Sequence, residues 1–326
     1  MVARDPSPYL TLRRFGATGL IVSPLCVGCA ELGNMPETFA YGVDEAQALE
    51  TLRAVFSGPI SFVDTAASYG DGESERRIGT VLRELGGVPD GFIVATKADR
   101  DLQSGDFSGD QMRRSVERSL RLLGVDRLPL VYLHDPEHSP FETIMAPGGA
   151  VEVLRRLVDE GVIEHLGLAG GPAQLCMRYV DTGAFEAVIT HNRYTLLNRS
   201  AEPLIALAAQ RGMGVANAAP YGSGILAKGP AAYPRYAYQD ASSDFVERAR
   251  QLEGLCRNAG VPLAAAALQF SLRDPCVHST IVGMSKPERL AQTVELASHP
   301  IPESLWEQID RVARPITEDP EEARWR

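Results

Sequence analysis

Short apolar runs alternate along the chain with longer stretches whose apolar residues recur every three or four positions, the helical period. The short runs are rich in Val, Ile, Leu and Ala, which is typical of strands buried on both faces of a parallel sheet. The longer stretches predict helices with one apolar face, as in residues 110–123, where Met112, Val116, Leu120 and Leu123 keep helical spacing. The predicted strands are residues 24–28, 60–64, 92–97, 130–134, 164–169, 187–190, 214–218 and 280–283.

Eight strands that each lead into a helix predict an α/β fold, a (β/α)8 TIM barrel. An N-terminal β-hairpin is expected within residues 10–22, where Gly16 and Gly19 are turn residues. Helical stretches at 243–258, 263–272 and 286–296 exceed what the strands require, so extra C-terminal helices are expected. No Pro/Gly/Ser-rich linker divides the 326 residues, and we therefore expect one domain over residues 1–326, with a loose tail from about residue 315.

Three of the predicted strands end in a residue that can take part in chemistry. Asp64 ends the second strand, Lys97 the third and His134 the fourth, while Tyr69 follows Asp64 in the next loop. A polar residue at one strand end can simply turn the chain towards solvent. In a TIM barrel, however, active sites lie at the carboxyl ends of the strands, and strands two to four are neighbours. The four side chains are therefore expected to meet at one end of the barrel.

Together these four residue types suit proton transfer to an oxygen on carbon. A phenol with a pKa near 10 exchanges protons poorly at neutral pH unless a cation lowers that pKa. We expect Lys97 to lower the pKa of Tyr69 by stabilising the phenolate, and Asp64 to keep Lys97 charged. His134 is placed to hydrogen-bond a substrate oxygen. Exchange of a hydride between a carbonyl and an alcohol needs such a set, and the hydride itself needs a cofactor.

Composition and charge exclude several classes of function. The net charge of −10 argues against nucleic acid as a partner. No apolar run approaches the roughly 18 residues of a membrane span, and the N-terminus lacks a secretory apolar region. The sequence therefore predicts a cytoplasmic protein with a small-molecule substrate, without a nucleic-acid or membrane partner, and either monomeric or homo-oligomeric.

Cysteine redox chemistry and metal binding are weaker alternatives. The chain has five cysteines, an odd number that does not predict a disulfide framework, although Cys26 and Cys29 form one C-x-x-C spacing. His134, Asp135 and His138 are ligand types that a metal-dependent barrel hydrolase would use, but Pro136 breaks the helix that would align the two imidazoles. We therefore expect no metal site.

The order and spacing of these residues carry a family resemblance. Asp64, Tyr69, Lys97 and His134 on strands two to four, the opening at residues 14–25, and the final Ile281-Val282-Gly283 resemble the aldo-keto reductase family over nearly the whole chain. Members of that family use an Asp-Tyr-Lys-His tetrad with a nicotinamide cofactor. The resemblance implies that Tyr69 is the acid/base, that Lys97 tunes it, that Asp64 pairs with Lys97, and that His134 orients the substrate.

The resemblance also implies where NAD or NADP would bind. In the family, the loop after strand seven lies along the pyrophosphate, and the loop and helix after strand eight hold the adenosine end. Glycine-rich turns with free backbone amides suit such an anion. The residues implicated are Gly28, Cys29, Asp64, His191, Ala218, Tyr221, Gly222, Ser223, Leu226, Gly283, Ser285, Lys286, Arg289, Gln292 and Thr293. Lys286 and Arg289 are the candidates for a 2′-phosphate.

Three positions depart from the family pattern near the expected nicotinamide site. Many members have a Ser-Asn pair after strand five, where this chain has Ala169-Gly170. A glutamine often follows strand six, where His191-Asn192 stands, and an aromatic residue that often follows strand seven is replaced by Ala218. The departures leave the choice between NAD and NADP open, while the tetrad is intact.

Local stretches favour one branch of the family. Residues 133–136, 192–197 and 217–221 look most like the aldose 1-dehydrogenases, including the L-fucose, D-threo-aldose and L-galactose types, with a pyridoxal dehydrogenase as a neighbour. Asp99, Arg100 and His191 would suit a hydroxyl-rich ligand. The resemblance implies an NAD(P)-dependent oxidoreductase that oxidises an aldose, or a pyridoxal-like hemiacetal, to a lactone. An NADPH-dependent aldehyde or ketone reductase and a non-catalytic nucleotide-binding barrel are the alternatives.

Overall fold

Eight parallel strands form a closed barrel at the centre of the computed structural model, which describes residues 11–312 and 316–321. Neighbouring strands around the barrel follow chain order, and the last strand closes on the first. The strands are β3 (Leu25–Gly28), β4 (Phe62–Asp64), β5 (Ile93–Ala98), β6 (Leu128–His134), β7 (Ile163–Ala169), β8 (Ala187–His191), β9 (Gly214–Ala218) and β12 (Ser279–Gly283). The predicted TIM barrel is confirmed. Strand β6 begins two residues before the predicted start, at Leu128. The prediction starts after Pro129 because proline is typical of strand ends.

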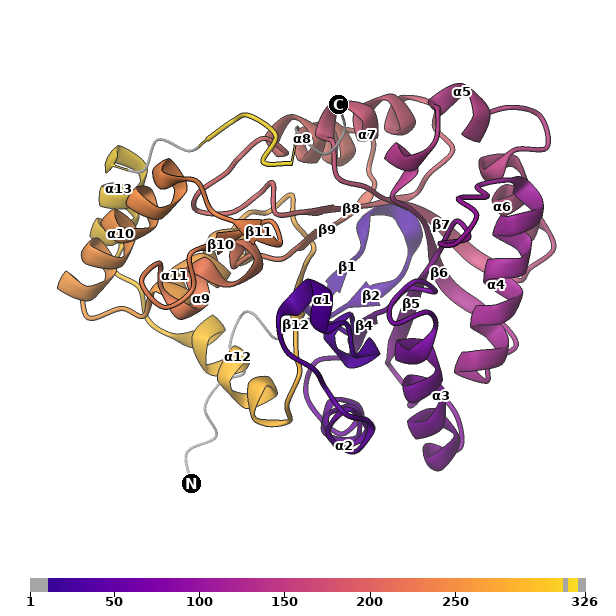
Figure 1. Cartoon of the computed structure of the whole chain (residues 1–326), viewed down its shortest axis with the longest axis horizontal. Helices are drawn as coiled ribbons and strands as arrows, with labels where there is room; N and C mark the ends of the chain where they lie inside the picture. Colours follow the sequence, from indigo (N-terminus) through magenta and orange to yellow (C-terminus); the bar gives the residue numbers. More distant parts are fainter. Residues whose placement is uncertain (1–10, 313–315, 322–326) are drawn as a thin grey trace.

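Helices surround the strands on all sides (Figure 1). The longer ones are α2 (Glu45–Phe56), α3 (Glu73–Leu85), α4 (Gly109–Leu123), α6 (Ala150–Asp159), α7 (Ala173–Asp181), α8 (Glu202–Gln210), α10 (Ser243–Asn258), α11 (Leu263–Leu272), α12 (Glu288–Ser298) and α13 (Glu303–Val312). Helices α10 and α13 pack together. Helix α10 is among the helical stretches expected near the C-terminus, whereas α13 lies beyond the last helix that the sequence analysis predicts. Short helices α1 (Pro36–Phe39), α5 (Phe141–Ile144) and α9 (Ile225–Lys228), and a small pair of strands, β10 (Arg235–Tyr236) and β11 (Gln239–Asp240), lie in the loops.

The amino end of the barrel is closed by the predicted hairpin, in which β1 (Arg13–Arg14) pairs with β2 (Ile21–Val22). The Phe15 ring packs edge-on against Phe62 at 5.7 Å between ring centroids, and the Ala17 amide donates to the Gly212 carbonyl at 2.8 Å. The Phe15 ring therefore closes the amino end of the barrel interior. The carboxyl ends of the strands, at the other end, remain accessible to a ligand.

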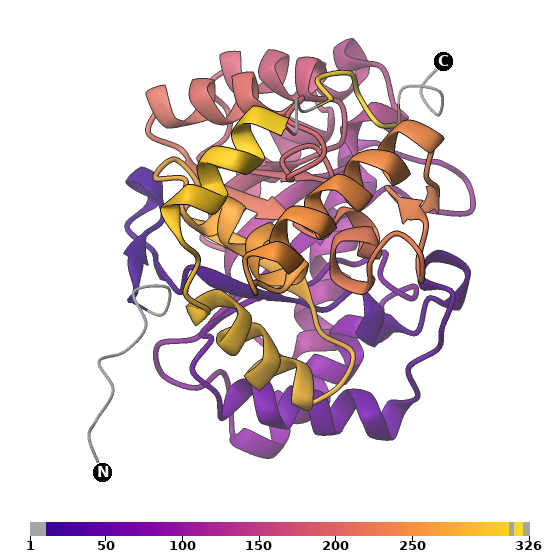
Figure 2. The ribbon, with the colours of Figure 1, turned by 90° about the vertical axis from the view of Figure 1, so that its left-hand side faces the viewer.

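The C-terminal segment, residues 316–321, lies against the barrel, although the sequence analysis expects a loose tail from about residue 315. The rest of that tail lies outside the described residues. Ile316 pairs with Asn198: its amide donates to the Leu197 carbonyl at 3.0 Å, and its carbonyl accepts from the Arg199 amide at 2.9 Å. The segment runs between α13 and α8 (Figure 1) and is also visible at the top of the turned view (Figure 2). Within this part of the tail, backbone hydrogen bonds to the loop after β8 account for the order.

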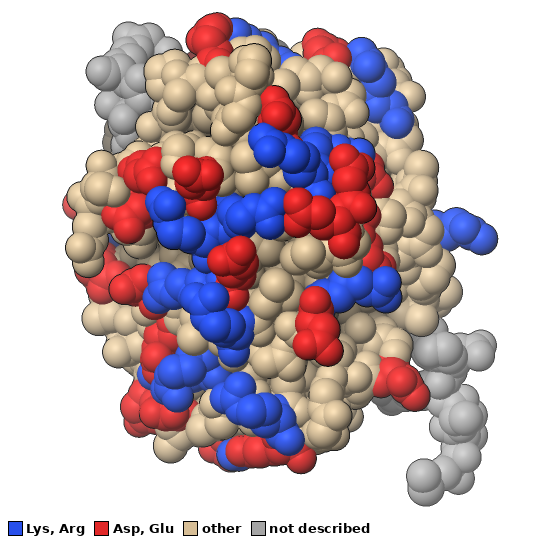
Figure 3. All heavy atoms as spheres, turned by 90° about the vertical axis from the view of Figure 1, so that its right-hand side faces the viewer, with Lys and Arg blue, Asp and Glu red and all other residues tan. Residues whose placement is uncertain are grey.

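Charges of both signs are interspersed over the face formed by α3, α4 and α6 (Figure 3). Ion pairs account for this pattern, among them Arg113 with Glu160 at 2.7 Å and Arg127 with Glu164 at 2.8 Å. The net negative charge is therefore not gathered on this face. Among the helices in residues 11–312 and 316–321, none is both long and apolar enough to pass through a membrane.

Candidate active site

The side chains at the ends of β4 and β5 meet around the Lys97 ammonium. Lys97 Nζ donates to Asp64 Oδ2 at 2.6 Å, to the Thr65 carbonyl at 2.9 Å and to Tyr69 Oη at 3.1 Å. These three contacts use all three ammonium hydrogens. Because the phenol oxygen accepts from Lys97, its own hydrogen is free to point to a ligand in the cleft. The predicted approach of Tyr69 to Lys97 is thus present.

Burial sets the proton affinities of this group as much as charge does. Burial raises the pKa of the Tyr69 phenol above its ordinary value, and the Lys97 ammonium offsets only part of that rise. Burial lowers the pKa of Lys97, but Asp64 and Tyr69 outweigh it, so the ammonium stays charged. The expectation that Lys97 lowers the pKa of Tyr69 is right for the lysine's contribution. It is wrong for the net pKa of Tyr69, which is raised, because the expectation omits the cost of burying a phenolate.

His134 is held on one edge by a carboxylate that comes from the neighbouring strand. Its Nδ1 lies 2.6 Å from Asp99 Oδ1, and since a carboxylate only accepts, Nδ1 donates. The other oxygen of Asp99 accepts from the Ser68 amide at 2.9 Å, one residue before Tyr69. Asp99 therefore fixes both the imidazole and the loop that carries the phenol, and leaves Nε2 of His134 for other partners.

Burial lowers the pKa of His134, but Asp135 and Asp99 outweigh it and raise that pKa above its ordinary value. The Tyr69 and His134 rings meet edge-on, with 5.8 Å between their centroids. The phenol and an imidazole that tends to be charged therefore share one side of the cleft. Both can donate a hydrogen to the same ligand oxygen.

Three strands turn sharply just after the residue that faces the cleft. Asp135 follows β6, Asn192 follows β8 and Ala219 follows β9, with φ values of 43°, 56° and 54°. Such a left-handed conformation is uncommon for residues with a side chain and is found at functional sites. The turns end the strands abruptly, so that each last strand residue stays at the carboxyl end of the barrel.

A cleft of about 950 Å³ opens over these strand ends. Asp64, Tyr69, Lys97 and His134 line it. Of the residues implicated in cofactor binding, those that line the cleft are Gly28, Asp64, His191, Ala218, Tyr221, Ser223, Gly283, Ser285, Lys286, Arg289, Gln292 and Thr293. Cys29 and Leu226 have no exposed surface and lie beneath the cleft wall.

Gly222, also implicated, has a supporting position behind the wall. Its φ of 58° favours glycine, and an added Cβ would overlap the ring of Tyr236. The tight turn keeps the neighbouring Tyr221 and Ser223 at the surface of the cleft. A side chain at position 222 would therefore disturb the turn, while a contact of the Gly222 backbone with a cofactor stays a prediction.

The residues present fit a nicotinamide dinucleotide. Asp64 Oδ1 and Tyr221 Oη are buried and have no hydrogen-bond partner within the described part of the chain, although both residues line the cleft. Ligand hydroxyl groups would satisfy such atoms. Lys228, Lys286 and Arg289 also line the cleft, where phosphates would find cations. Burial and the nearby Arg289 lower the pKa of Lys228.

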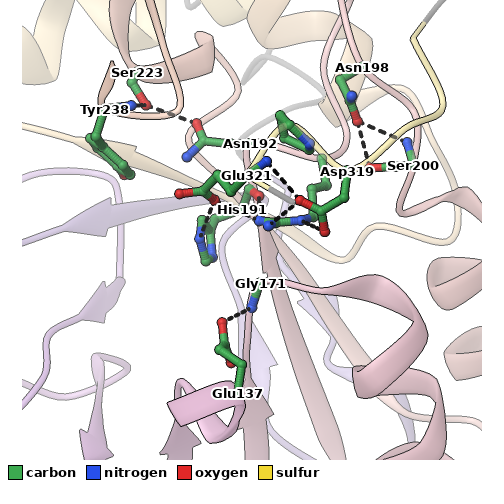
Figure 4. A network of polar contacts seen from close by, with 12 residues as sticks. Glu137, Gly171, His191, Asn192, Asn198, Ser200, Ser223, Tyr238, Asp319 and Glu321 are labelled. Carbon is green, nitrogen blue, oxygen red and sulfur yellow. Dashed lines mark hydrogen bonds and ion pairs between the residues drawn. The ribbon is translucent and has the colours of Figure 1, made fainter. Parts of the chain in front are cut away.

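Several cleft residues escape the sequence analysis. Glu31 lies so close to Gly283 that an added Cβ there would overlap its carboxyl, and burial raises the pKa of Glu31 to about 7. From the sequence, Asp99 is assigned to a hydroxyl-rich ligand, and its contact with His134 is missed. That contact could have been found, since Asp99 lies two residues after Lys97 and strand residues two apart share a face. Glu321, beside His191, carries no sequence signal (Figure 4).

Cys26 and Cys29 are both free thiols and fully buried, and burial raises the pKa of each well above its ordinary value. Over residues 11–312 and 316–321, no three or more His, Cys, Asp or Glu side chains are arranged to hold a metal ion.

The comparisons with known proteins agree with this geometry. Residues 24–314 match the model of the aldo/keto reductase family. The chain is 33% identical to D-threo-aldose 1-dehydrogenase of a Pseudomonas species, over 90% of this chain and 94% of that protein. It is 30% identical to pyridoxal 4-dehydrogenase of Microbacterium luteolum, over 90% of this chain and 95% of that protein.

A solved structure supports the fold. The holo form of an aldo-keto reductase from Bacillus halodurans superposes with a TM-score of 0.76, covering 95% of this chain and 98% of that one at 24% identity. The family match spans most of the chain and includes the barrel that carries Asp64, Tyr69, Lys97 and His134. The protein therefore belongs to the aldo-keto reductase family and is an oxidoreductase acting on CH–OH or C=O groups.

Proposed function

We propose that the protein oxidises the anomeric hydroxyl of an aldose, or the hemiacetal of a pyridoxal-like compound, to a lactone with NAD or NADP. The observation that carries the proposal is the hydrogen bond from Lys97 to Tyr69 at the wall of a polar cleft. The similarity to an aldose dehydrogenase and a pyridoxal dehydrogenase adds the substrate class.

Tyr69 is the proton-transfer residue in this proposal. Its oxygen takes the proton of the substrate hydroxyl during oxidation, and Lys97 stabilises the phenolate form that precedes this step. Asp64 holds Lys97 in the charged state. His134, whose pKa is raised, donates from Nε2 to the same substrate oxygen and orients it. The nicotinamide cofactor, when bound, supplies the hydride acceptor.

The substrate side of the cleft suits several hydroxyl groups. Arg100, Asp135 and His191 line it and come from three different loops or strand ends. Burial raises the pKa of Asp135, but His134, His191 and nearby cations outweigh it, so that pKa lies below its ordinary value. An ionised carboxylate with an adjacent guanidinium and imidazole offers both acceptors and donors, which a sugar hydroxyl needs.

A panel of substrates tests the proposal. Aldoses, pyridoxal and simple aldehydes are each incubated with NAD⁺, NADP⁺, NADH and NADPH, and the absorbance of the reduced cofactor is followed. We expect formation of reduced cofactor with at least one aldose or with pyridoxal, and a product two hydrogens lighter by mass spectrometry. Reaction with aldehydes and reduced cofactor alone, and with no aldose or pyridoxal, would contradict the proposed direction.

One observation favours a second candidate, the reduction of aldehydes or ketones with NADPH. The raised pKa of Tyr69 keeps the phenol protonated, which is the form that donates to a carbonyl oxygen. The two directions have opposite pH dependences. Oxidation should speed up as the pH rises and Tyr69 loses its proton, whereas reduction should slow down.

The cations that line the cleft bear on the choice of cofactor. If Arg289 holds a 2′-phosphate, R289Q weakens NADPH binding about tenfold and leaves NADH binding within about twofold. Fluorescence titration of the reduced cofactors measures both constants. E288Q, a change of an exposed neighbour on the same helix, is the matched control.

A further inference from the structure

A buried arginine ties the C-terminal segment to the end of β8. Arg193 lies two residues after His191, and its side chain has no exposed surface. Its guanidinium donates to both carboxylate oxygens of Asp319 at 2.9 and 2.7 Å and to Glu321 Oε2 at 2.9 Å. A buried guanidinium is tolerated only when its hydrogens are paired. Both of its carboxylate partners come from the C-terminal segment, residues 316–321.

Backbone contacts lay this segment along a defined path towards the cleft. Asn198 Nδ2 donates to the Glu318 carbonyl at 2.8 Å, and Gln239 Nε2 donates to the Pro320 carbonyl at 3.1 Å. Along the segment, Glu318 and Pro320 make these backbone contacts, and the residues that follow each of them contact Arg193. Figure 4 shows the acidic side chains of the segment converging beside His191. The segment therefore ends beside His191, a residue that lines the cleft.

Glu321 makes a second contact that faces the site. The oxygen that accepts from Arg193 lies 3.6 Å from His191 Nε2. The side chain of Glu321 is 3% exposed, whereas that of His191 is 25% exposed and lines the cleft. The carboxylate thus lies behind the imidazole, and the imidazole lies between the carboxylate and a ligand.

His191 is the polar residue among three neighbouring strand ends, and Asp135, which also lines the cleft, interacts with it electrostatically. The strands on either side of β8 end in Ala169 and Ala218, and both of these line the cleft. An imidazole with no fixed partner can present either ring nitrogen to a ligand. The carboxylate of Glu321 attracts the Nε2 edge and so limits which edge turns to the cleft.

We propose that Glu321 is a positioning residue for His191, and that His191 contacts a hydroxyl of the substrate. The C-terminal segment, anchored by Arg193, then supports the substrate-binding wall from behind. This rests on the proposed function for the substrate, but the placement of His191 by Glu321 can be tested without turnover.

The kinetic test uses the full chain with E321Q and the matched control E318Q, which changes an exposed carboxylate on the same segment. For the best substrate of the panel, E321Q should raise KM about five- to tenfold and leave kcat within about twofold. The dissociation constant of the reduced cofactor, from fluorescence titration, should also stay within about twofold. E318Q should match the wild type. An unchanged KM in E321Q overturns the proposal.

A double-mutant cycle separates action through His191 from a general structural role. If Glu321 acts through His191, then H191N raises KM by a similar factor, and E321Q adds little to it in the double variant. Fully additive effects of the two changes overturn the proposal. Measurement well below the unfolding temperature of each variant keeps differences in stability out of the result.

Chemical labelling tests the placement without substrate. Diethyl pyrocarbonate modifies accessible imidazoles, and peptide mass mapping gives the rate at His191. That rate should rise in E321Q and stay unchanged in E318Q, with the exposed His138 as an internal reference in all three proteins. Equal labelling of His191 in wild type and E321Q overturns the positioning role, even if the panel yields no turnover and the proposed function itself fails.

Discussion

Two histidines line the same cleft, and each is backed by a carboxylate, but the two pairs are built differently. His134 and Asp99 lie 35 residues apart on adjacent strands, and the contact is a direct hydrogen bond of 2.6 Å. His191 is reached by Glu321 at 3.6 Å, through a segment whose anchoring arginine lies 128 residues away in sequence. The first pair is fixed by barrel register, and the second depends on docking of the C-terminal segment.

The difference suggests a division of labour. Parallel strands in register hold their ends rigidly, which suits groups that must stay within hydrogen-bonding distance during proton transfer. A docked segment can differ from one barrel to another without disturbing the strands, which suits substrate recognition. We therefore expect changes at the first pair to act on the chemical step, and changes at the second on substrate affinity.

Removal of the Tyr69 hydroxyl should have the largest effect on turnover, and the effects of changes at the two histidine–carboxylate pairs are compared with it. Y69F should lower kcat about 10²–10⁴-fold, because the proton-transfer group is gone. The ring remains, so the affinity for reduced cofactor should stay near that of the wild type in a fluorescence titration. A Y69F protein with wild-type turnover would remove the reason for placing either histidine in a catalytic site.

Breaking the anchor of the second pair should cost stability. R193M removes the guanidinium that pairs with the buried Glu321 and with Asp319. We expect the free energy of unfolding to fall by about 3 kcal/mol, the lower end for buried pairs. Denaturant unfolding measures the change. The triple variant R193M/D319N/E321Q should recover part of the loss, because no unpaired charge remains. Equal stability of R193M and wild type would show that the segment does not depend on Arg193.

Neutralising the carboxylate of the first pair should alter both rate and proton affinity. The carboxamide introduced by D99N would keep one acceptor but lose the charge that helps to raise the pKa of His134. We expect kcat/KM to fall about tenfold through misplacement of the ring, and the NMR titration midpoint of His134 to move to lower pH. D110N, at an exposed carboxylate, is the control. An unchanged midpoint would show that Asp99 does not influence the charge state of His134.

The direction of the pH effect on stability follows from the same pKa. His134 has a higher pKa folded than unfolded, so its contribution to stability is complete below the unfolded value of about 6.5. That contribution is lost as the pH rises through the folded pKa. Compared with wild type, D99N should therefore be destabilised more at acid than at alkaline pH, as measured by thermal unfolding across that window.

The sequence was sufficient for the barrel and for the side chains at strand ends, and the reason is periodicity. Alternating strands and helices place Asp64, Lys97 and His134 at one end of the barrel whatever the details of packing. Asp99 follows from the same strand periodicity. The pKa of Tyr69 does not, because the cost of burying a phenolate depends on how tightly the surrounding side chains pack.

The C-terminal segment was beyond sequence reasoning for a different reason. Polar, proline-containing residues near a chain end are typical of loose tails. The pairing of Arg193 with Asp319 and Glu321 leaves no local pattern, since it joins segments that only the closed barrel brings together. Cys29 and Leu226 differ from the other implicated residues, because their side chains are buried in the core, and their contact with a cofactor stays a prediction.

Single-turnover hydride transfer in D99N and E321Q, each saturated with substrate and cofactor, tests the division of labour most directly. The account predicts that transfer slows about tenfold in D99N and stays within about twofold of wild type in E321Q. Transfer that slows as much in E321Q as in D99N would contradict it.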